Sequence, residues 1–314
     1  MLSLYELSVF LEAAECGNFS ETGRNLHLSQ PAISQKIENL QKHFGTKLFV
    51  RDGRSMRLTE SGMALRPLAK ELITAARRID ETMVSLQGEV IGEMTIGCST
   101  ASGKYLLPGL IASFRKSYPN VRINVNVTSR KSVFNKLLGG DVALGISSMK
   151  IPHRDLEYKE FFKDDVILIA PAGHPWESVD SIKPEELMDE PIILREEAAG
   201  TRDVFMKAVL EIGFSQDMLN VVMELGNAEA IEMAVEQKIG VAFISRLAAE
   251  RGLELGYISE VAVRGLDLTR DIYLTRSKRS PSTRAQIKFW DFVNPSNLGI
   301  EDKKPVLDRE QIPV

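Results

Sequence analysis

Residues 19–44 read FSETGRNLHLSQPAISQKIENLQKHF and decide the fold of the N-terminal part of the chain. Two amphipathic helical patterns, residues 20–27 and 30–43, follow each other with only Leu28 and Ser29 between them, a spacing typical of a helix-turn-helix. Ser29 can accept hydrogen bonds from the first turn of the second helix, and Pro31 fits there because its missing N–H would be unbonded anyway. The sequence therefore predicts a second helix that begins at this point.

The second helix has an apolar and a polar side. Ile33, Ile37, Leu40 and Phe44 recur at helical spacing, so we expect them to be buried. The polar first turn suits base edges, because glutamine can pair with adenine in two places and serine can donate or accept. The residues expected at the DNA from this helix are Ser29, Gln30, Pro31, Ser34, Gln35 and Lys36.

A cationic hairpin follows the second helix. Two short extended runs, residues 48–51 and 56–59, flank the turn sequence Asp52-Gly53. Arginine in a surface hairpin is often only solubilising, but beside a helix-turn-helix such a hairpin is a wing that contacts phosphates or the minor groove. We therefore favour DNA contact, and the residues concerned are Arg51, Arg54 and Arg57.

Charge and composition limit the class of protein. The chain has 314 residues and a net charge of -4, but residues 24–57 carry seven cations and two anions, as a DNA-binding region requires. Its length allows two or three domains. Two cysteines are too few for a zinc site or a disulfide framework, which predicts a reducing, cytoplasmic setting without a metal. No apolar run approaches the roughly 20 residues that cross a bilayer, so we expect no membrane partner.

Residues 59–86 are expected to form one long helix. An apolar stripe runs along it at the a/d spacing of a coiled coil. Such a stripe could pack on its own chain, but it lies between two domains without obvious local cover, so we favour dimerisation. The residues of the stripe are Leu65, Leu68, Leu72, Ala75, Ile79 and Leu86.

The N-terminal 60 or so residues resemble the winged helix-turn-helix of the LysR-type transcriptional regulators. The match rests on Phe19-Ser20, on LHLSQPAIS at residues 26–34, on Gly45 and on Leu48-Phe49, all at fixed spacing. The resemblance implies a sequence-specific regulator that binds dyad-symmetric double-stranded DNA as a homotetramer, a dimer of dimers. It leaves RNA polymerase open as a further partner, and it implies a small-molecule effector but no cofactor.

From residue 93 to residue 294 strand-like and helical segments alternate, which predicts an α/β fold with mostly parallel strands. This part resembles the family's effector domain, two subdomains around a cleft like those of periplasmic binding proteins. The expected limits are 1–58 for the DNA-binding domain, 59–90 for the linker helix and 91–294 for the effector domain. Within the effector domain, subdomain I covers about 91–165 and 269–294 and subdomain II about 166–268, while the polar segment 295–314 is predicted to be a mobile tail.

Polar residues at four strand ends or helix starts predict a ligand site. Helix N-termini and the carboxyl ends of strands offer free N–H groups to anions, so we expect a small oxyanion or carboxylate in the cleft. Each residue taken alone could instead be a helix cap. The expected effector-binding residues are Ser99, Thr100, Ser102, Ser129, Gly200, Thr201, Arg202 and Asn227.

The segments GTRDVF and LGNAEAI resemble the LysR subgroup that responds to inorganic sulfur or carbon-assimilation signals. Cys98, next to the expected site, could report oxidation, although we favour the reading of a buried small apolar residue. The alternative to a regulator is a solute-binding protein or an enzyme on the same cleft fold. The enzyme is disfavoured because the sequence shows no Ser/His/Asp set, P-loop or dinucleotide-binding glycine pattern.

Overall fold

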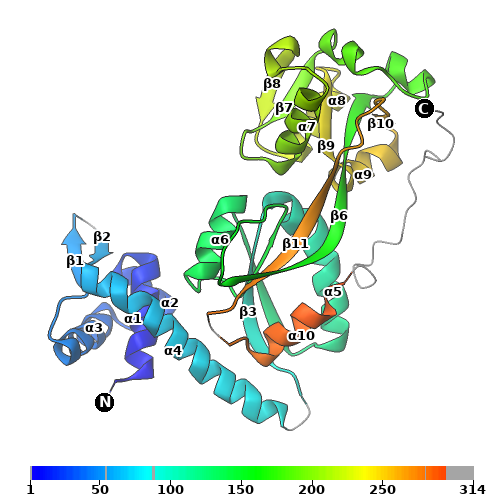
Figure 1. Cartoon of the computed structure of the whole chain (residues 1–314). Coiled ribbons are helices and arrows are strands. Elements are labelled where there is room, and N and C mark those ends of the chain that lie inside the picture. The colour runs from blue at the N-terminus through cyan, green and yellow to red at the C-terminus, as the bar shows by residue number, and fades with distance from the viewer. Residues whose placement is uncertain (1, 54, 87–88, 280, 295–314) are drawn as a thin grey trace.

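The computed structural model describes residues 2–53, 55–86, 89–279 and 281–294, which form three parts in succession (Figure 1). A small helical head comes first, a long helix leads away from it, and an α/β domain completes the chain. Arg54 of the expected wing and the expected tail, 295–314, lie outside the described residues.

The head is a three-helix unit with a β-hairpin. Gly17 ends the first helix in the left-handed region, with φ of 61°. Ser29 caps the third helix by accepting from Ala32 N–H at 3.4 Å, as predicted for Ser29. Phe49 of the hairpin packs edge-to-face on Phe10 and Phe19, with ring centroids 5.5 and 5.4 Å away. The elements are α1 (Leu4–Cys16), α2 (Phe19–Asn25), α3 (Gln30–Phe44), β1 (Phe49–Asp52) and β2 (Ser55–Leu58).

The apolar stripe of α3 is buried except at its last residue. Ile33, Ile37 and Leu40 are at most 2% exposed, as expected. The prediction for Phe44 is wrong, because this side chain is 40% exposed. Phe44 is the last residue of the helix and is not among the buried residues of the head's core; its ring lies 5.0 Å from that of His43.

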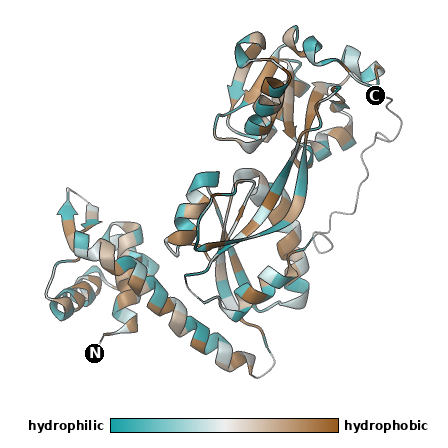
Figure 2. Cartoon of the chain, viewed as in Figure 1, coloured by the Kyte–Doolittle hydropathy of each residue, from teal (hydrophilic) through white to brown (hydrophobic). Residues whose placement is uncertain are grey.

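The long helix α4 (Glu60–Ser85) begins at Thr59, whose side chain accepts from Gly62 N–H at 3.1 Å. Its first half packs on the head through Ala69 and, in part, Leu65. Along the rest of the helix, hydrophobic and hydrophilic residues alternate around its circumference (Figure 2). The exposed apolar side chains of the predicted stripe and its neighbourhood are Leu68, Leu72, Ile79, Met83 and Leu86.

The α/β domain has one twisted sheet in two halves, in the order β4-β3-β5-β11-β6-β9-β7-β8, with β10 paired to β6. The first half holds β3 (Gly92–Cys98), β4 (Val121–Val127), β5 (Leu144–Ser147), the π-helix η1 (Ser102–Leu106), α5 (Leu107–Ser117), α6 (Arg130–Leu138) and α10 (Arg284–Phe292). We call it subdomain I. The second half, subdomain II, holds β7 (Ile192–Arg195), β8 (Val221–Leu225), β9 (Val241–Ser245), β10 (Ile258–Val261), α7 (Gly200–Glu211), α8 (Ala228–Glu236), α9 (Arg246–Leu255) and the short helices η2 (Pro175–Ser178), η3 (Pro184–Met188) and η4 (Gln216–Met218).

Two long strands, β6 (Leu156–Pro171) and β11 (Thr269–Ser277), join the halves and pair antiparallel from Asp165–Thr269 to Leu156–Ser277. The expectation of mostly parallel strands is therefore wrong at the centre of the sheet: four of the eight pairings in it are parallel, and every pairing of β6 and β11 is antiparallel. Among the strand-like segments of the sequence, VILIA at residues 166–170 covers only the second part of β6, and no such segment covers β10. The domain limits given above stay predictions.

Candidate functional site

The first candidate site is the outer face of α3. Ser29, Gln30, Pro31 and Gln35 are exposed, while Ser34 is half-buried. The Gln30 amide donates to Ser34 Oγ at 2.8 Å, so these two side chains lie side by side on the first turn. Pro31 and the Ser29 cap fix the start of the helix. The start of α3 therefore presents a surface in which the polar groups of Gln30 and Ser34 lie together.

Lys36 stands apart from that surface. Its ammonium lies over the ring of Tyr5 in α1, 5.3 Å from the centroid. This cation–π contact keeps the charge on the head without neutralising it.

The β1–β2 hairpin presents its arginines beside α3. Arg51 donates to Gly53 O at 3.2 Å, and Arg57 pairs with Asp52 at 3.2 Å, both on the exposed surface. The hairpin is tied to α3 by Gln41, whose amide oxygen accepts from Leu48 N–H at 2.8 Å. The start of the hairpin is therefore held against α3, next to the polar face of that helix.

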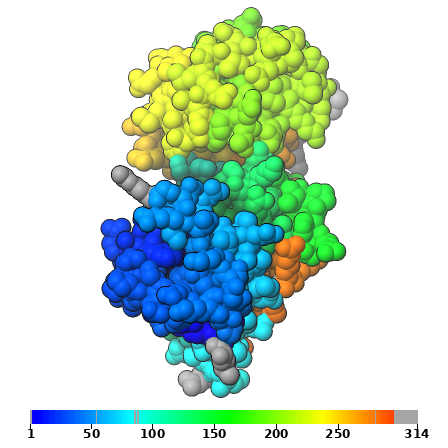
Figure 3. All heavy atoms as spheres, turned by 90° about the vertical axis from the view of Figure 1, so that its left-hand side faces the viewer, coloured from blue at the N-terminus to red at the C-terminus, as the bar shows by residue number. Residues whose placement is uncertain are grey.

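Figure 3 shows the same head in space-filling view: the blue N-terminal residues face the viewer, and the yellow residues of subdomain II lie above them uncovered. The head is therefore open to a partner on this side.

The second candidate site is a cavity of about 220 Å³ between the two subdomains. Subdomain I supplies the segments after β3, β4 and β5, and subdomain II supplies the end of β7 and the start of α7. The lining residues are Ser99, Thr100, Ala101, Thr128, Ser129, Arg130, Ser148, Arg195, Glu196, Ala198, Ala199, Gly200 and Arg270. Ser99, Thr100, Ser129 and Gly200, expected at the effector from the sequence, are thus brought together.

Polar groups converge on Gly200, the first residue of α7. A Cβ built there would lie 2.7 Å from Ser148 Oγ, 2.8 Å from Arg270 Nη1 and 3.1 Å from Arg130 Nη1. Ala199, the residue before the helix, provides no side-chain cap among the described residues. The free N–H groups at the start of α7 and two guanidinium groups therefore face one small space, which suits an anion.

Each arginine of the cavity already has a carboxylate partner. Arg130 bridges the subdomains by donating to Ala198 O at 3.0 Å and to Asp203 at 2.6 Å. Arg270 pairs with the buried Asp164 at 2.6 Å. Arg195 pairs with its neighbour Glu196 at 2.8 Å. A ligand must therefore compete with the chain's own carboxylates.

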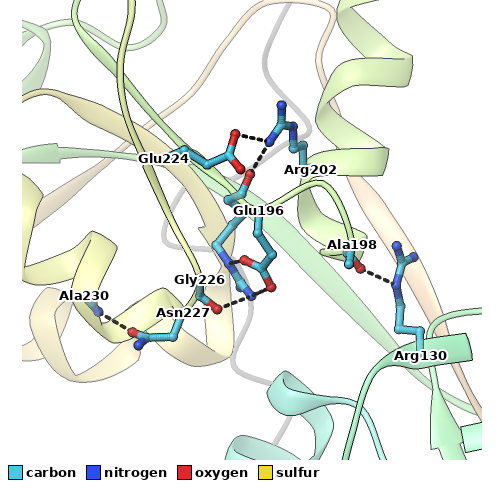
Figure 4. Close-up of polar contacts among 9 residues, drawn as sticks. Arg130, Glu196, Ala198, Arg202, Glu224, Gly226, Asn227 and Ala230 are labelled. Atoms are coloured by element: carbon cyan, nitrogen blue, oxygen red, sulfur yellow. Dashed lines mark hydrogen bonds and ion pairs between the residues drawn. The ribbon is translucent and has the colours of Figure 1, made fainter. Parts of the chain in front are cut away.

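Four of the expected effector residues lie outside the cavity lining. Ser102 is buried with its Oγ 3.2 Å from Ser99 Oγ, and Thr201 is buried with its Oγ1 unpartnered among the described residues. Arg202 donates to Arg195 O at 2.8 Å and to Glu224 at 2.6 Å. Its guanidinium is therefore engaged on the other side of α7 (Figure 4).

Asn227 is used as a helix cap, with its side-chain oxygen accepting from Ala230 N–H at 2.6 Å (Figure 4). In place of Arg202, the structure places Arg130, Arg195 and Arg270 at the cavity, together with Thr128 and Ser148. Arg130 follows Ser129 directly, and that adjacency is the one signal that could have indicated it. Arg270 lies 70 residues beyond Gly200 in the chain, and no local pattern indicates their proximity.

Cys98 is buried at the end of β3, and burial raises the pKa of its thiol to about 11. The thiolate, which is the reactive form, is therefore scarce at neutral pH. This agrees with the reading of Cys98 as a small buried side chain.

The described residues contain no group of three or more His, Cys, Asp or Glu side chains placed to hold a metal ion. No helix in them combines the length and the apolar character that a membrane span needs.

Comparisons with known proteins identify both parts of the chain. The family model described as "Bacterial regulatory helix-turn-helix protein, lysR family" matches residues 4–63, and the model described as "LysR substrate binding domain" matches residues 87–296. An uncharacterised HTH-type transcriptional regulator of Methanocaldococcus jannaschii is 32% identical, over 90% of this chain and 96% of its own length. The transcriptional activator CmpR of Synechocystis is 29% identical, over 93% of this chain and 94% of its own length.

Three solved structures share the fold. A full-length OxyR variant from Pseudomonas aeruginosa has a TM-score of 0.72 at 23% identity and covers 93% of this chain and 98% of its own. Full-length CbnR with its target DNA has a TM-score of 0.65 at 18% identity, covering 93% and 99%. The regulatory domain of Synechocystis CcmR, in complex with 2-PG, has a TM-score of 0.60 at 22% identity, covering 67% and 99%.

Proposed function

The chain belongs to the LysR family of DNA-binding transcriptional regulators, and from that premise we propose that a small anion, an oxyanion or a carboxylate, controls it from the cavity between the subdomains. The family consists of regulators rather than enzymes, and its helix-turn-helix binds DNA.

One observation carries the effector proposal: Arg130 from subdomain I and Arg270 from the crossing strand β11 converge with Ser148 on the start of α7. Charge-assisted hydrogen bonds from guanidinium groups are roughly twice as strong as neutral ones, and a helix N-terminus adds partial positive charge. An apolar ligand would offer these donors no acceptor and would gain nothing from the positive charge around Gly200. The first probe is 2-PG, because the CcmR regulatory domain shares this fold and is solved with it.

We expect 2-PG, sulfate or phosphate to stabilise the full-length chain against heat, because a ligand held by the folded form at 100 times its Kd adds about 2.7 kcal/mol. Gly200→Ala should lower the affinity for that anion by roughly tenfold to a hundredfold, since the new methyl group displaces Ser148 and Arg270 from the ligand and each lost charge-assisted bond costs about 1.5–3 kcal/mol. Titration calorimetry on both chains measures the difference.

The matched control is Ala208→Gly, a change of the same size in the middle of α7 and away from the cavity lining. It should leave anion affinity at the wild-type level. Equal affinity in the Gly200→Ala chain would remove the cavity from consideration as the effector site.

For DNA, we propose that Gln30 and Ser34 read base edges while Arg51 and Arg57 hold phosphates. Gln30→Ala should reduce the difference in binding free energy between the preferred operator and its single-base variants by about 1–3 kcal/mol.

Arg57→Ala should instead weaken binding to every sequence and lower the slope of log affinity against log salt concentration by about 1. Fluorescence anisotropy over a salt series and an operator-variant panel separates the two effects. Unchanged base preference in the Gln30→Ala chain would contradict the assignment of the first turn.

We further propose that two chains pair through the exposed stripe of α4 and present two heads to a dyad-symmetric site, and that two such dimers form a tetramer. Support comes from the four apolar side chains at a/d spacing, each at least 45% exposed: Leu68, Leu72, Ile79 and Leu86. A paired stripe removes this apolar surface from water. We also propose RNA polymerase as a further partner, which only the resemblance to the family supports.

A further inference from the structure

The helix α6 (Arg130–Leu138) runs from the cavity between the subdomains toward the linker helix α4. We propose that α6 couples the cavity to α4, so that a ligand at Arg130 changes the hold of Asp141, just beyond the end of α6, on Arg66 and Lys70 of α4. This inference rests on the proposed function, because it assumes an anion at Arg130.

At the cavity end, the first residue of α6 is already attached to the opposite subdomain. Arg130 donates to Ala198 O at 3.0 Å and to Asp203 at 2.6 Å, and both acceptors lie at the start of α7. The side chain of Arg130 is only 13% exposed, whereas that of Asp203 is 53% exposed. An anion in the cavity competes with Asp203 for the guanidinium and so alters the position of the N-terminus of α6.

The tight packing of α6 on β5 favours movement of this helix as a rigid body. Val133, Phe134 and Leu137 are at most 2% exposed. Gly145 of β5 has no side chain where an added Cβ would meet Leu137 and Val133, so α6 lies directly on the backbone of that strand. Nine residues at 1.5 Å each make a helix about 13.5 Å long, and the helix shifts known from allosteric interfaces are of about 1–2 Å.

At the other end, Asp141 follows the Gly139-Gly140 turn and meets two cations of α4. Arg66 Nη2 lies 3.4 Å from its carboxylate, and Lys70 forms an ion pair with it. Arg66 also pairs with Glu15 of α1 at 3.3 Å. The chain of charges therefore reaches from the end of α6 to the DNA-binding head itself.

The seam between α4 and subdomain I can yield. A cavity of about 360 Å³ lies along it, lined by Lys70, Thr74 and Arg77 of α4 and by residues 137–143. Charged contacts join α4 to subdomain I at this end, because Arg66 and Lys70 both face Asp141. A small movement of Asp141 therefore suffices to change the contact.

The far end of the seam is firm by comparison. Glu81 is 6% exposed and lies where α4 meets α10, with Thr283 and the backbone of Arg284 and Ala285 near its carboxyl group. Burial raises the pKa of the Glu81 carboxyl. Glu81 lies 11 residues beyond Lys70, about 16 Å along the helix. It provides a fixed point about which α4 can tilt.

The proposed pairing of α4 with a second copy and its contact with subdomain I use different faces of the helix. Lys70, Thr74, Arg77 and Glu81 recur at four, three and four residues and so share one face of the helix. At 100° per residue, Leu72 and Ile79 point to the opposite face. A second copy can pair on the apolar face while subdomain I holds the polar one.

The test uses the full-length chain and measures the factor by which saturating 2-PG, sulfate or phosphate changes its affinity for an operator selected from a random duplex pool. Asp141→Ala and Lys70→Ala should each bring that factor close to one, and the charge-swapped chain Lys70→Glu/Asp141→Lys should recover part of it. The affinity for the anion itself should stay within about twofold, because the variants remove coupling and not the site. If the anion changes the operator affinity of the Asp141→Ala chain as much as that of the wild type, the proposal is wrong.

The control is Lys207→Ala, which removes a lysine from the exposed pair Lys207–Glu211 of α7. It should keep the wild-type factor, whereas the same loss in this chain as in Asp141→Ala would mean that the coupling does not run through Asp141.

A second measurement needs no ligand and keeps the two proposals separable. Arg130→Ala, at one end of α6, should increase amide hydrogen exchange around residues 66–77 of α4, because coupling between two sites is reciprocal. Unchanged exchange there would overturn the coupling even if an anion binds. Conversely, if none of the three anions binds while exchange in α4 responds, the effector class is wrong and the coupling stands.

Discussion

A chain carrying Ile79→Glu is expected to be monomeric at micromolar concentration and to lose operator affinity by roughly 100-fold to 10,000-fold, the gain that linking two binding heads provides. Ile79 is 64% exposed in the single chain and sits in the middle of the apolar stripe of α4. A glutamate between two such helices would be buried without a partner, which costs several kcal/mol. Sedimentation velocity measures the mass, and anisotropy with operator DNA measures the affinity.

Met63→Glu is the matched control for this prediction. Met63 is 59% exposed and lies on the same helix, but seven residues before Lys70 and thus away from the stripe. This variant should keep the wild-type mass. A dimeric Ile79→Glu chain with full operator affinity would show that the stripe does not join two copies.

Arg270→Ala is expected to lower the free energy of unfolding by about 3–5 kcal/mol, because it leaves a buried carboxylate without its counter-charge. Asp164 is 2% exposed, its carboxylate lies 2.6 Å from Arg270 Nη2, and its other oxygen accepts from Ser245 at 2.7 Å. The pair joins β6 to β11 where the subdomains meet. Urea denaturation followed by circular dichroism measures the loss.

The control for this prediction is Lys163→Ala, next to Asp164 on the same strand. Its ion pair with Asp271 spans 3.8 Å and Lys163 is 63% exposed, so the change should stay within about 0.5 kcal/mol. In the double variant Arg270→Ala/Asp164→Ala, part of the loss should be recovered because the unpaired charge is gone. Comparable losses in the Arg270→Ala and Lys163→Ala chains would refute the structural role of the pair.

The head could be predicted nearly to the residue because its signals are local. Ser29 and Gly17 set helix ends through their own backbone and side-chain chemistry, and Ile33 and Ile37 repeat at the period of the helix. Phe44 shares that period, but the core that would cover it ends before the helix does. Periodicity indicates a face of a helix and carries no information on how far the neighbouring elements extend.

The long strand β6 was predicted only in its second half for a different reason. Residues 156–165 are rich in charged side chains, which are uncommon in a central strand. Their partners lie across the sheet: Glu157 pairs with Arg276 of β11 at 2.8 Å. Such cross-strand pairs stabilise a sheet only between residues brought together by the fold. Over 119 residues of separation, no sequence pattern indicates this pairing.

For the ligand cavity, the sequence predicted the polar loop residues but not the arginines that line it. Arg202 follows Gly200 by two residues, and at 100° per residue its side chain points about 200° away from Gly200 on α7. There it meets Arg195 O and Glu224 instead of a ligand. Arg130 and Arg270 reach the cavity only because two subdomains meet, and the sequence alone does not show that meeting.

The pairing of β6 with β11 also sets the order in which the two subdomains can be completed during translation. Subdomain I opens the α/β domain with β3, yet its sheet and core need β11 and α10, the last described elements to be translated. Subdomain II lies between them and emerges first as a complete unit. In a nascent chain halted before Thr269, subdomain II would be complete and subdomain I would not. Phe114 of subdomain I would still lack Phe289, whose ring lies 5.0 Å from its own in the folded chain.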